Sequence, residues 1–197
     1  MTTILKTNVP CIKLYKNIFT VDECSELIGL LLYKSTISWN EYNTKFDQNR
    51  MITAFSWKRI KDLRYDPHPI SKHMDIFSIV NTKIRDEILM ELDKQRLIEF
   101  NNRIIDRWVC YLYEDGNSSS PETECIFTPG TPVIIIILGA SRYLIVRSKK
   151  TGESILKKRV REGMVLCLFE EFSKYYTYQV PKEECSCLHI QMFGSFT

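Results

Sequence analysis

A change in the spacing of apolar residues near position 103 constrains the fold of this chain more than any other feature. Before it, apolar residues recur at helical spacing after Thr20 and again over about 72–96. After it, short apolar segments alternate with turns, which is typical of strands. The predicted strands are 104–113, 132–138, 142–147, 155–161, 164–169, 174–180 and 187–193. Helices followed by a run of strands predict an α+β domain, with the helices bracing one side of a β-sandwich or barrel.

Local signals support both helices. Thr20 and Glu23 form a capping-box pattern, and the apolar residues that follow them lie on one helical face, so this helix should pack on a larger body. The turn at 66–69 precedes the second helix, because each of its prolines disfavours helix before it. Residues 11–19 have the pattern of a short strand and turn, whereas 40–60 are mixed in character.

Apolar runs and cysteines indicate the compartment. The longest purely apolar run, Val133–Leu138, is far too short to span a bilayer, and the start of the chain lacks the apolar core of a signal peptide. We therefore expect no membrane insertion and a cytoplasmic or nuclear location. The seven cysteines are scattered, several of them within apolar segments, which favours reduced, buried thiols over a disulfide framework.

Net charge and residue usage give weaker indications of the partner and the origin of the chain. The net charge is +3, from 27 basic and 24 acidic residues, which is little support for a polyanionic partner. The chain is rich in isoleucine, lysine and asparagine, and it has only 7 glycines. This bias is typical of AT-rich coding, as in many large DNA viruses and some protists, so a viral origin is one expectation.

Five segments in the C-terminal half follow the order of a known family. Tyr111–Gly116 is similar to a strand and turn of pattern Asn-x-Tyr-x-Asp-Gly, and Thr128–Val133 to Pro-Gly-Ser-Pro-Ile. Leu138–Arg147 is similar to Leu-Gly-x-x-Arg-x-Phe-x-x-Arg, and Val160–Phe169 to Leu-x-x-Gly followed by an apolar strand. Tyr175–Pro181 is similar to x-Tyr-x-His-x-Val-Pro. Together these segments resemble the AlkB-like iron(II)- and 2-oxoglutarate-dependent oxygenases.

The resemblance implies a specific architecture. It covers residues 103–193 and implies a double-stranded β-helix, or jelly roll, over that range. Residues 1–100 match more thinly and would form a helical brace and a region similar to the family's nucleotide lid. We therefore expect a single domain over 1–197, with the jelly roll braced by N-terminal helices.

The resemblance also implies an iron site that this sequence lacks. The family holds iron(II) with a His-x-Asp pair and a distant histidine, which leaves positions open for 2-oxoglutarate and oxygen. None of the three histidines, which are His68, His73 and His189, lies between 74 and 188, where both ligands should fall. By position, Ser120–Glu122 replaces the His-x-Asp pair and Tyr178 replaces the second histidine.

The 2-oxoglutarate site is altered in the same way. The family's last strand carries two arginines, one of which pairs with a carboxylate of the cosubstrate. Their positions fall at Cys187 and Phe193, and strand alternation turns His189 and Gln191 to the same inward side. We hypothesise that the rings of Tyr178 and Phe193 plug the former pocket, and we expect no metal and no organic cofactor. The residues of this degenerate pocket are Tyr113, Ser120, Glu122, Tyr178, Cys187, His189 and Phe193.

Two basic surfaces are candidates for partner binding. The first lies in the lid-like region and mixes cations with aromatic residues, and the second lies on a predicted hairpin. The first set suits base stacking with phosphate contacts and equally suits a protein interface. The second set suits phosphate contacts with nucleic acid, or is simply a solvated hairpin. The candidate residues are Arg50, Trp57, Lys58 and Arg59 in the first set, and Lys149, Lys150, Lys157, Lys158, Arg159 and Arg161 in the second.

Three functions remain open on the sequence. The first is a catalytically inactive AlkB-like pseudoenzyme that acts as a binding or structural protein, with a protein as its favoured partner because the net charge is low. The second is a nucleic-acid-binding protein that uses the former substrate surface. The third is a divergent dioxygenase with a non-standard metal arrangement around Glu122, Tyr178 and His189. The sequence does not specify the oligomeric state.

Overall fold

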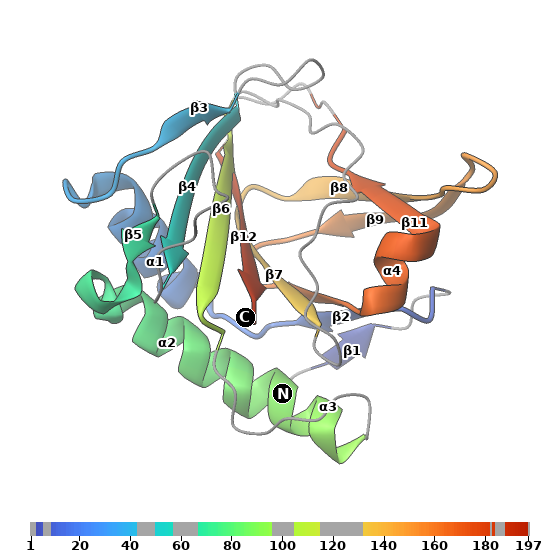
Figure 1. Cartoon of the computed structure of the whole chain (residues 1–197), viewed down its shortest axis with the longest axis horizontal. Coiled ribbons are helices and arrows are strands. Elements are labelled where there is room, and N and C mark those ends of the chain that lie inside the picture. Colours follow the sequence, from blue (N-terminus) through green and yellow to red (C-terminus); the bar gives the residue numbers. More distant parts are fainter. Residues whose placement is uncertain are drawn as a thin grey trace.

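Two mostly antiparallel sheets and a set of helices make up the fold, as Figure 1 shows. The computed structural model describes residues 3–5, 9–42, 50–56, 67–95, 105–114, 132–181, 183 and 188–196. Its helices are α1 (Val21–Tyr33), the short 3₁₀ turn η1 (Ile70–Lys72), α2 (Met74–Ile84), the π turn η2 (Arg85–Leu89), α3 (Met90–Lys94) and α4 (Glu170–Tyr175).

The large sheet carries the C-terminal strands at its centre and N-terminal strands at both ends. In spatial order its strands are β1 (Thr3–Leu5), β2 (Ile12–Lys16), β10 (Val165–Leu168), β7 (Val133–Gly139), β12 (His189–Ser195), β6 (Arg107–Tyr113), β4 (Arg50–Ser56) and β3 (Asn40–Tyr42), and β5 (His68–Pro69) pairs in parallel with β4. The small sheet has the order β11 (Tyr176–Gln179), β8 (Arg142–Ser148), β9 (Ser154–Val160).

The chain passes repeatedly from one sheet to the other. After β7 in the large sheet it enters the small sheet for β8 and β9, returns for β10, crosses again for β11 and ends in β12 of the large sheet. Such crossing between two facing sheets is the arrangement of a jelly roll. The predicted α+β class and double-stranded β-helix are therefore confirmed. The N-terminal half does more than brace this core, because it adds strands to both ends of the large sheet.

Burial on both faces explains the unbroken apolar run of β7. Ile134 and Ile136 belong to the core formed with the helices, whereas Ile135 and Ile137 belong to the core between the two sheets. A strand that is covered on both faces reads as a continuous hydrophobic segment, because neither set of alternating side chains meets water. β7 therefore lies at the centre of a layered structure of helices, large sheet and small sheet.

The helices form where the sequence predicts them. The capping box is present, with the Glu23 carboxylate accepting from the Thr20 N–H at 2.8 Å and Thr20 Oγ1 accepting from the Glu23 N–H at 3.2 Å. The predicted second helix runs from α2 through η2 to α3, interrupted by the π turn. Within the described residues, no helix is both long enough and apolar enough to cross a membrane.

Two strands were not predicted, and one predicted strand begins as a helix. Residues 40–60, which showed no clear period, contain β3 and β4; in β4 residues 52–56 are all buried, so no exposed polar face marks the strand. Within the predicted strand 174–180, the first residues instead end helix α4, and the strand starts at Tyr176. The run of tyrosines favours a strand locally, but the chain uses a helical turn to cross from β10 to the other sheet.

The described cysteines are reduced and buried, as predicted. Cys11, Cys24, Cys110 and Cys167 are all free. Burial raises the pKa of the Cys24 thiol to about 12 and that of Cys11 to about 11, so both are protonated at neutral pH. These thiols act as small apolar groups in the core. The other three cysteines lie outside the described residues.

Gly163 joins the first helix to the jelly roll through its backbone. Its carbonyl accepts from the N–H groups of Ile18 and Phe19 at 3.1 and 3.2 Å, and its own N–H donates to Ile137 O at 3.0 Å. Its φ is +75°, and a Cβ placed there would lie 2.3 Å from Phe19 O. Position 163 therefore requires glycine for both its dihedral angle and its close backbone contact.

We predict that Gly163→Ala destabilises the protein by about 3 kcal/mol or more, because it adds a backbone clash to the cost of a positive φ. Gly152→Ala is the matched control, since Gly152 has φ +74° but nothing within 4 Å of the added Cβ. We expect that control to lose only about 1–2 kcal/mol. Urea denaturation of the three proteins measures the difference, and equal losses in the two variants would contradict the proposed clash.

Candidate functional site

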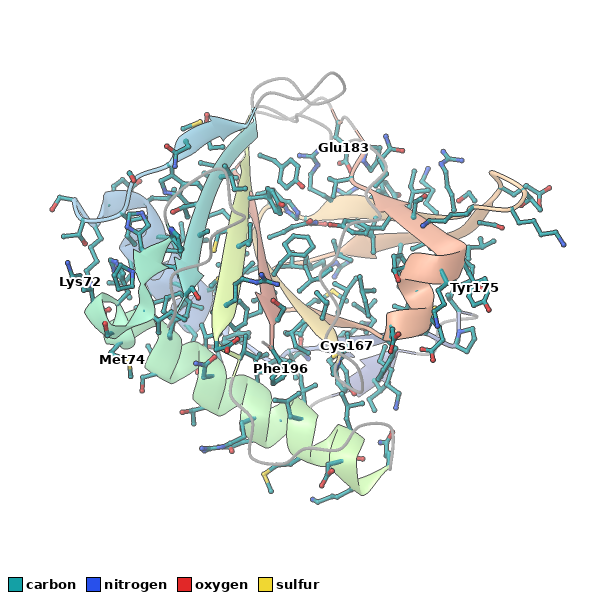
Figure 2. The ribbon with its side chains drawn as sticks, in the orientation of Figure 1. Lys72, Met74, Cys167, Tyr175, Glu183 and Phe196 are labelled. Atoms are coloured by element: carbon teal, nitrogen blue, oxygen red, sulfur yellow. The ribbon has the colours of Figure 1, made fainter. Side chains whose placement is uncertain are left out.

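The space between the two sheets is where the sequence places the candidate pocket. It receives the inward side chains of β6 and β12 from the large sheet and of β8 and β11 from the small sheet. The side chains drawn in Figure 2 fill the region between these strands, with Glu183, which follows β11, at its upper end. Two groups of side chains occupy this space, one polar and one aromatic.

His189 is the centre of the polar group. It is fully buried, its Nδ1–H donates to Ala140 O at 2.7 Å, and its Nε2 lies 3.2 Å from Gln191 Nε2. A carbonyl can only accept, so the proton belongs on Nδ1, and Nε2 accepts from the Gln191 amide. Burial lowers the pKa of His189 to about 4, so the ring is neutral at pH 7. The Tyr113 ring lies beside it, with the centroids 5.7 Å apart.

Arg142 is a second buried polar residue of this space. It starts β8 and is 0% exposed. Its guanidinium donates to Pro181 O at 2.7 Å, and its Nε lies 3.8 Å from Glu183 Oε1. A buried arginine requires such partners, because its charge cannot be removed by deprotonation. The Glu183 carboxylate therefore helps to hold Arg142 at the end of the small sheet.

The aromatic group packs together with the aliphatic side chains of the same core. The Tyr178 and Phe193 rings stack with centroids 6.0 Å apart and an interplanar angle of 27°, and Tyr111 meets Phe193 edge-on at 5.2 Å. Phe172 from α4 packs against Tyr178 at 6.3 Å. Tyr178 is 1% exposed and Phe193 is 9% exposed. These rings from both sheets form one continuous apolar contact.

The structure brings the described pocket residues together in two pairs. Tyr113 contacts His189, and Tyr178 contacts Phe193. The expected inward direction of His189, Gln191 and Phe193 is confirmed by the His189–Gln191 hydrogen bond and by the place of Phe193 in the core between the sheets. Ser120, Glu122 and Cys187 lie outside the described residues.

Arg142 and Tyr111 were not predicted as pocket residues. The available signal for Arg142 was strand alternation, because residues 142, 144 and 146 share one face and the last two are apolar. A charged residue on an otherwise apolar face is unusual enough to mark a buried polar site. Tyr111 is two residues before Tyr113 and lies on the same face by the same argument.

The two candidate surfaces differ in what the structure describes. Trp57, Lys58 and Arg59 lie outside the described residues, and for Arg50 only the backbone, as the first residue of β4, is described. The second set lies together on the β8–β9 hairpin. Lys149 and Lys150 are at its turn, Lys157, Lys158 and Arg159 are on β9, and Arg161 follows that strand.

The described residues do not fit an iron site of the kind the resemblance implies. Both ring nitrogens of His189 are engaged, with Ala140 O and Gln191, and the Tyr178 ring is stacked on Phe193. Within the described part of the chain, no group of three His, Cys, Asp or Glu side chains has the arrangement to hold a metal ion.

Comparison with solved structures identifies the fold. The chain is similar to OsALKBH1, with a TM-score of 0.67 and 12% sequence identity, over 96% of this chain and 100% of that one. It is also similar to a prolyl-4-hydroxylase of Pseudomonas putida (TM-score 0.54, 10% identity, 93% of this chain and 91% of that one). The viral collagen prolyl hydroxylase of Paramecium bursaria Chlorella virus-1, solved with 2-oxoglutarate, gives a TM-score of 0.54 and 10% identity over 94% of this chain and 96% of that one.

Sequence comparison adds no closer assignment. No protein-family model matches the chain, and no curated protein matches it. At identities of 10–12% the structural likeness shows the fold alone. The chain therefore has the double-stranded β-helix fold that AlkB-like proteins share with prolyl hydroxylases.

We predict that His189 makes stability fall in mild acid. Its pKa is about 4 in the folded protein and near 6.5 when unfolded, so its contribution is complete above pH 6.5 and is lost as the pH falls from 6.5 towards 4. The full loss is about 3 kcal/mol. Urea denaturation between pH 7.5 and pH 4 measures it, and His189→Gln should flatten the profile while lowering stability overall.

His73→Gln is the control for that experiment. His73 is also buried and its pKa is lowered by burial, but it lies on the other side of the large sheet beside Phe55. As the pH falls, this variant should still lose the free energy of unfolding that depends on His189. Parallel stability profiles for the wild type and His189→Gln would contradict a neutral, buried His189.

Proposed function

We propose that this protein is a catalytically inactive AlkB-like pseudoenzyme that works by binding a partner. The observation that carries the proposal is the stacked pair of Tyr178 and Phe193 between the sheets. In the resemblance to the oxygenases, these two positions correspond to an iron-binding histidine and a cosubstrate-binding arginine. A phenol and a phenyl ring in their place remove one ligand and one anion contact together.

The space between the sheets is occupied by packed side chains, whatever the identity of the former ligands. An oxygenase must admit 2-oxoglutarate, oxygen and part of its substrate between the sheets, which requires a cleft lined by polar groups. Here Tyr178 is 1% exposed and contacts Phe172 on one side and Phe193 on the other. Packed rings of this kind behave as core, because opening the space would cost their mutual contacts.

The state of His189 supports the same conclusion. A metal-binding histidine offers one nitrogen to the metal and donates the other N–H to a supporting acceptor. His189 has the supporting contact, at Ala140 O, but its second nitrogen accepts from Gln191. The hydrogen bond thus uses the lone pair that a metal would need. The divergent-dioxygenase alternative therefore has no specific contact in its favour among the described residues.

A protein is the partner class that we propose. The net charge of +3 provides little general attraction for nucleic acid. The cations of the described second set lie on one hairpin, where a local contact can use them without a strongly basic surface overall. Tighter binding of a single-stranded nucleic acid than of an acidic peptide would favour the nucleic-acid alternative.

We predict that the purified protein does not convert 2-oxoglutarate to succinate when supplied with iron(II), ascorbate and oxygen. Succinate release measured by mass spectrometry, with an active AlkB-like enzyme as the positive control, tests this. Iron titration by isothermal calorimetry should show no saturable site. Succinate that rises with protein concentration and disappears in His189→Phe would overturn the proposal.

We also predict that the Tyr178 ring is a structural element. Tyr178→Ala should lower the free energy of unfolding by about 3–5 kcal/mol, because it leaves a cavity between the sheets. Tyr178→Phe is the matched control, which keeps the ring and should lose only about 1 kcal/mol. A small aromatic such as benzene should restore part of the stability of Tyr178→Ala by filling the cavity. Wild-type stability in Tyr178→Ala would show that the ring does not fill a packed space.

A further inference from the structure

The β8–β9 hairpin leaves one strand of the small sheet with a free edge. The sheet order is β11, β8, β9, and among the described residues no strand pairs with the outer side of β9. Figure 1 shows the turn of this hairpin extending outward past α4. An edge strand presents a row of backbone N–H and C=O groups that can pair with another extended chain. β9 runs over Ser154–Val160, and its pairing with β8 is regular over Leu156–Val160, beyond an irregularity in register between Val146 and Arg147. This regular stretch is long enough to pair with an added strand.

Cations flank that edge on both faces of the sheet. Arg159 and Lys157 pair with Tyr143 and Ile145, which lie on the outer face, whereas Lys158 pairs with the buried Leu144 of the inner face. Lys157 and Arg159 are exposed and Lys158 is half-buried. The strand from Ser154 to Val160 contains no acidic residue. An added strand would therefore meet positive charge on both of its faces.

Two of these cations are held in place before any partner arrives. The Lys157 ammonium lies 4.7 Å from the centroid of the Tyr143 ring, and the Arg159 guanidinium lies 5.1 Å from it. Arg159 also donates from Nε to Ser141 Oγ at 2.8 Å. Ordering long side chains in advance reduces the entropy that binding must remove. This separates the pair from the freely moving lysines of an ordinary solvated surface.

The charges restrict what can pair with β9. A second copy of β9 would place lysines and arginine opposite lysines and arginine, and like charges across strands are unfavourable. Single-stranded nucleic acid binds sheet faces chiefly through bases that stack on exposed aromatic rings. On this face the Tyr143 ring already has two cations against it. An extended segment with carboxylates on both faces satisfies the backbone edge and the cations together.

We infer that the β9 edge binds an acidic, extended peptide segment of a partner protein by strand addition, with Lys157, Lys158 and Arg159 selecting for carboxylates. The inference rests on the proposed function in taking the protein to act by binding. Backbone hydrogen bonds supply attachment, and the three cations supply the choice of partner. Glu183, whose Oε2 lies 3.7 Å from Arg159 Nη2, marks the kind of group that the partner would bring to this cation.

Fluorescence polarisation with a labelled peptide tests the inference on the full chain. The probe has three consecutive glutamates flanked by valines, and a second probe has lysines in place of the glutamates. We expect saturable binding of the first probe only. The double variant Lys157→Glu/Arg159→Glu should weaken that binding by about tenfold or more and should create binding of the lysine probe, since each cross-strand charge pair changes sign.

The matched control is Lys16→Glu/Lys72→Glu, which changes net charge equally at two exposed lysines away from the hairpin. It should bind the glutamate probe within about twofold of the wild type, and circular dichroism should show the same fold in both variants. Equal weakening in the two double variants would overturn the inference, because it would mean that only total charge matters.

Two further measurements separate strand addition from other modes of binding. Two glutamate probes are made that are N-methylated at alternate residues. One probe lacks the N–H groups that would face β9, and the other lacks those that would face solvent. One version should lose binding far more than the other, and equal affinities would overturn strand addition.

Binding of an oligothymidylate tests the class of partner. If the oligothymidylate binds more tightly than the glutamate probe, and if Lys157→Glu/Arg159→Glu abolishes that binding, the choice of an acidic peptide is overturned. Turnover of 2-oxoglutarate would refute the proposed function without changing peptide affinity, so the two failures are distinguishable.

Discussion

The fold depends on a large sheet that is covered on both faces. Helices pack on one side through Ile134 and Ile136 of β7, and the small sheet packs on the other through Ile135 and Ile137. If β7 shifted by one residue against its neighbours, its helix-facing and sheet-facing side chains would exchange places. Both sets are apolar, so β7 alone does not fix the register of the sheet. β12 fixes it, because the same shift would move His189 and Gln191 into the helix-facing core, away from their hydrogen bonds.

The interior between the sheets thus combines two kinds of burial. The Tyr178–Phe193 stack contributes area and dispersion contacts, as any core does. His189, Gln191 and Arg142 are buried polar groups, and their hydrogen bonds offset part of the cost of removing them from water. Gln191 Oε1 has no partner among the described residues, which costs about 1–3 kcal/mol. Buried polar groups beside packed rings and aliphatic side chains are what we expect if the proposed pseudoenzyme is correct.

The inner face of the small sheet belongs to the core and its outer face carries exposed cations. The carboxylate of Glu183 lies near a cation of each face. Glu183 Oε1 lies near buried Arg142 and accepts from the Tyr143 N–H at 2.7 Å, while Oε2 lies near exposed Arg159. Packing on the inner face therefore positions the cations of the outer face. Sequence and structure agree well on this hairpin because β8 alternates regularly up to Val146: Leu144 and Val146 point inward, whereas Tyr143 and Ile145 point outward.

The sequence by itself determined the fold class, the capping box, the seven C-terminal strands to within a few residues and the inward side of β12, because these follow from local period and chemistry. It also determined that no histidine lies between 74 and 188. Only the tertiary structure decided that β4 is a strand and that the Tyr178 ring meets Phe193. Those outcomes depend on contacts between residues far apart in the chain, and no local pattern records which distant side chain will cover a given face.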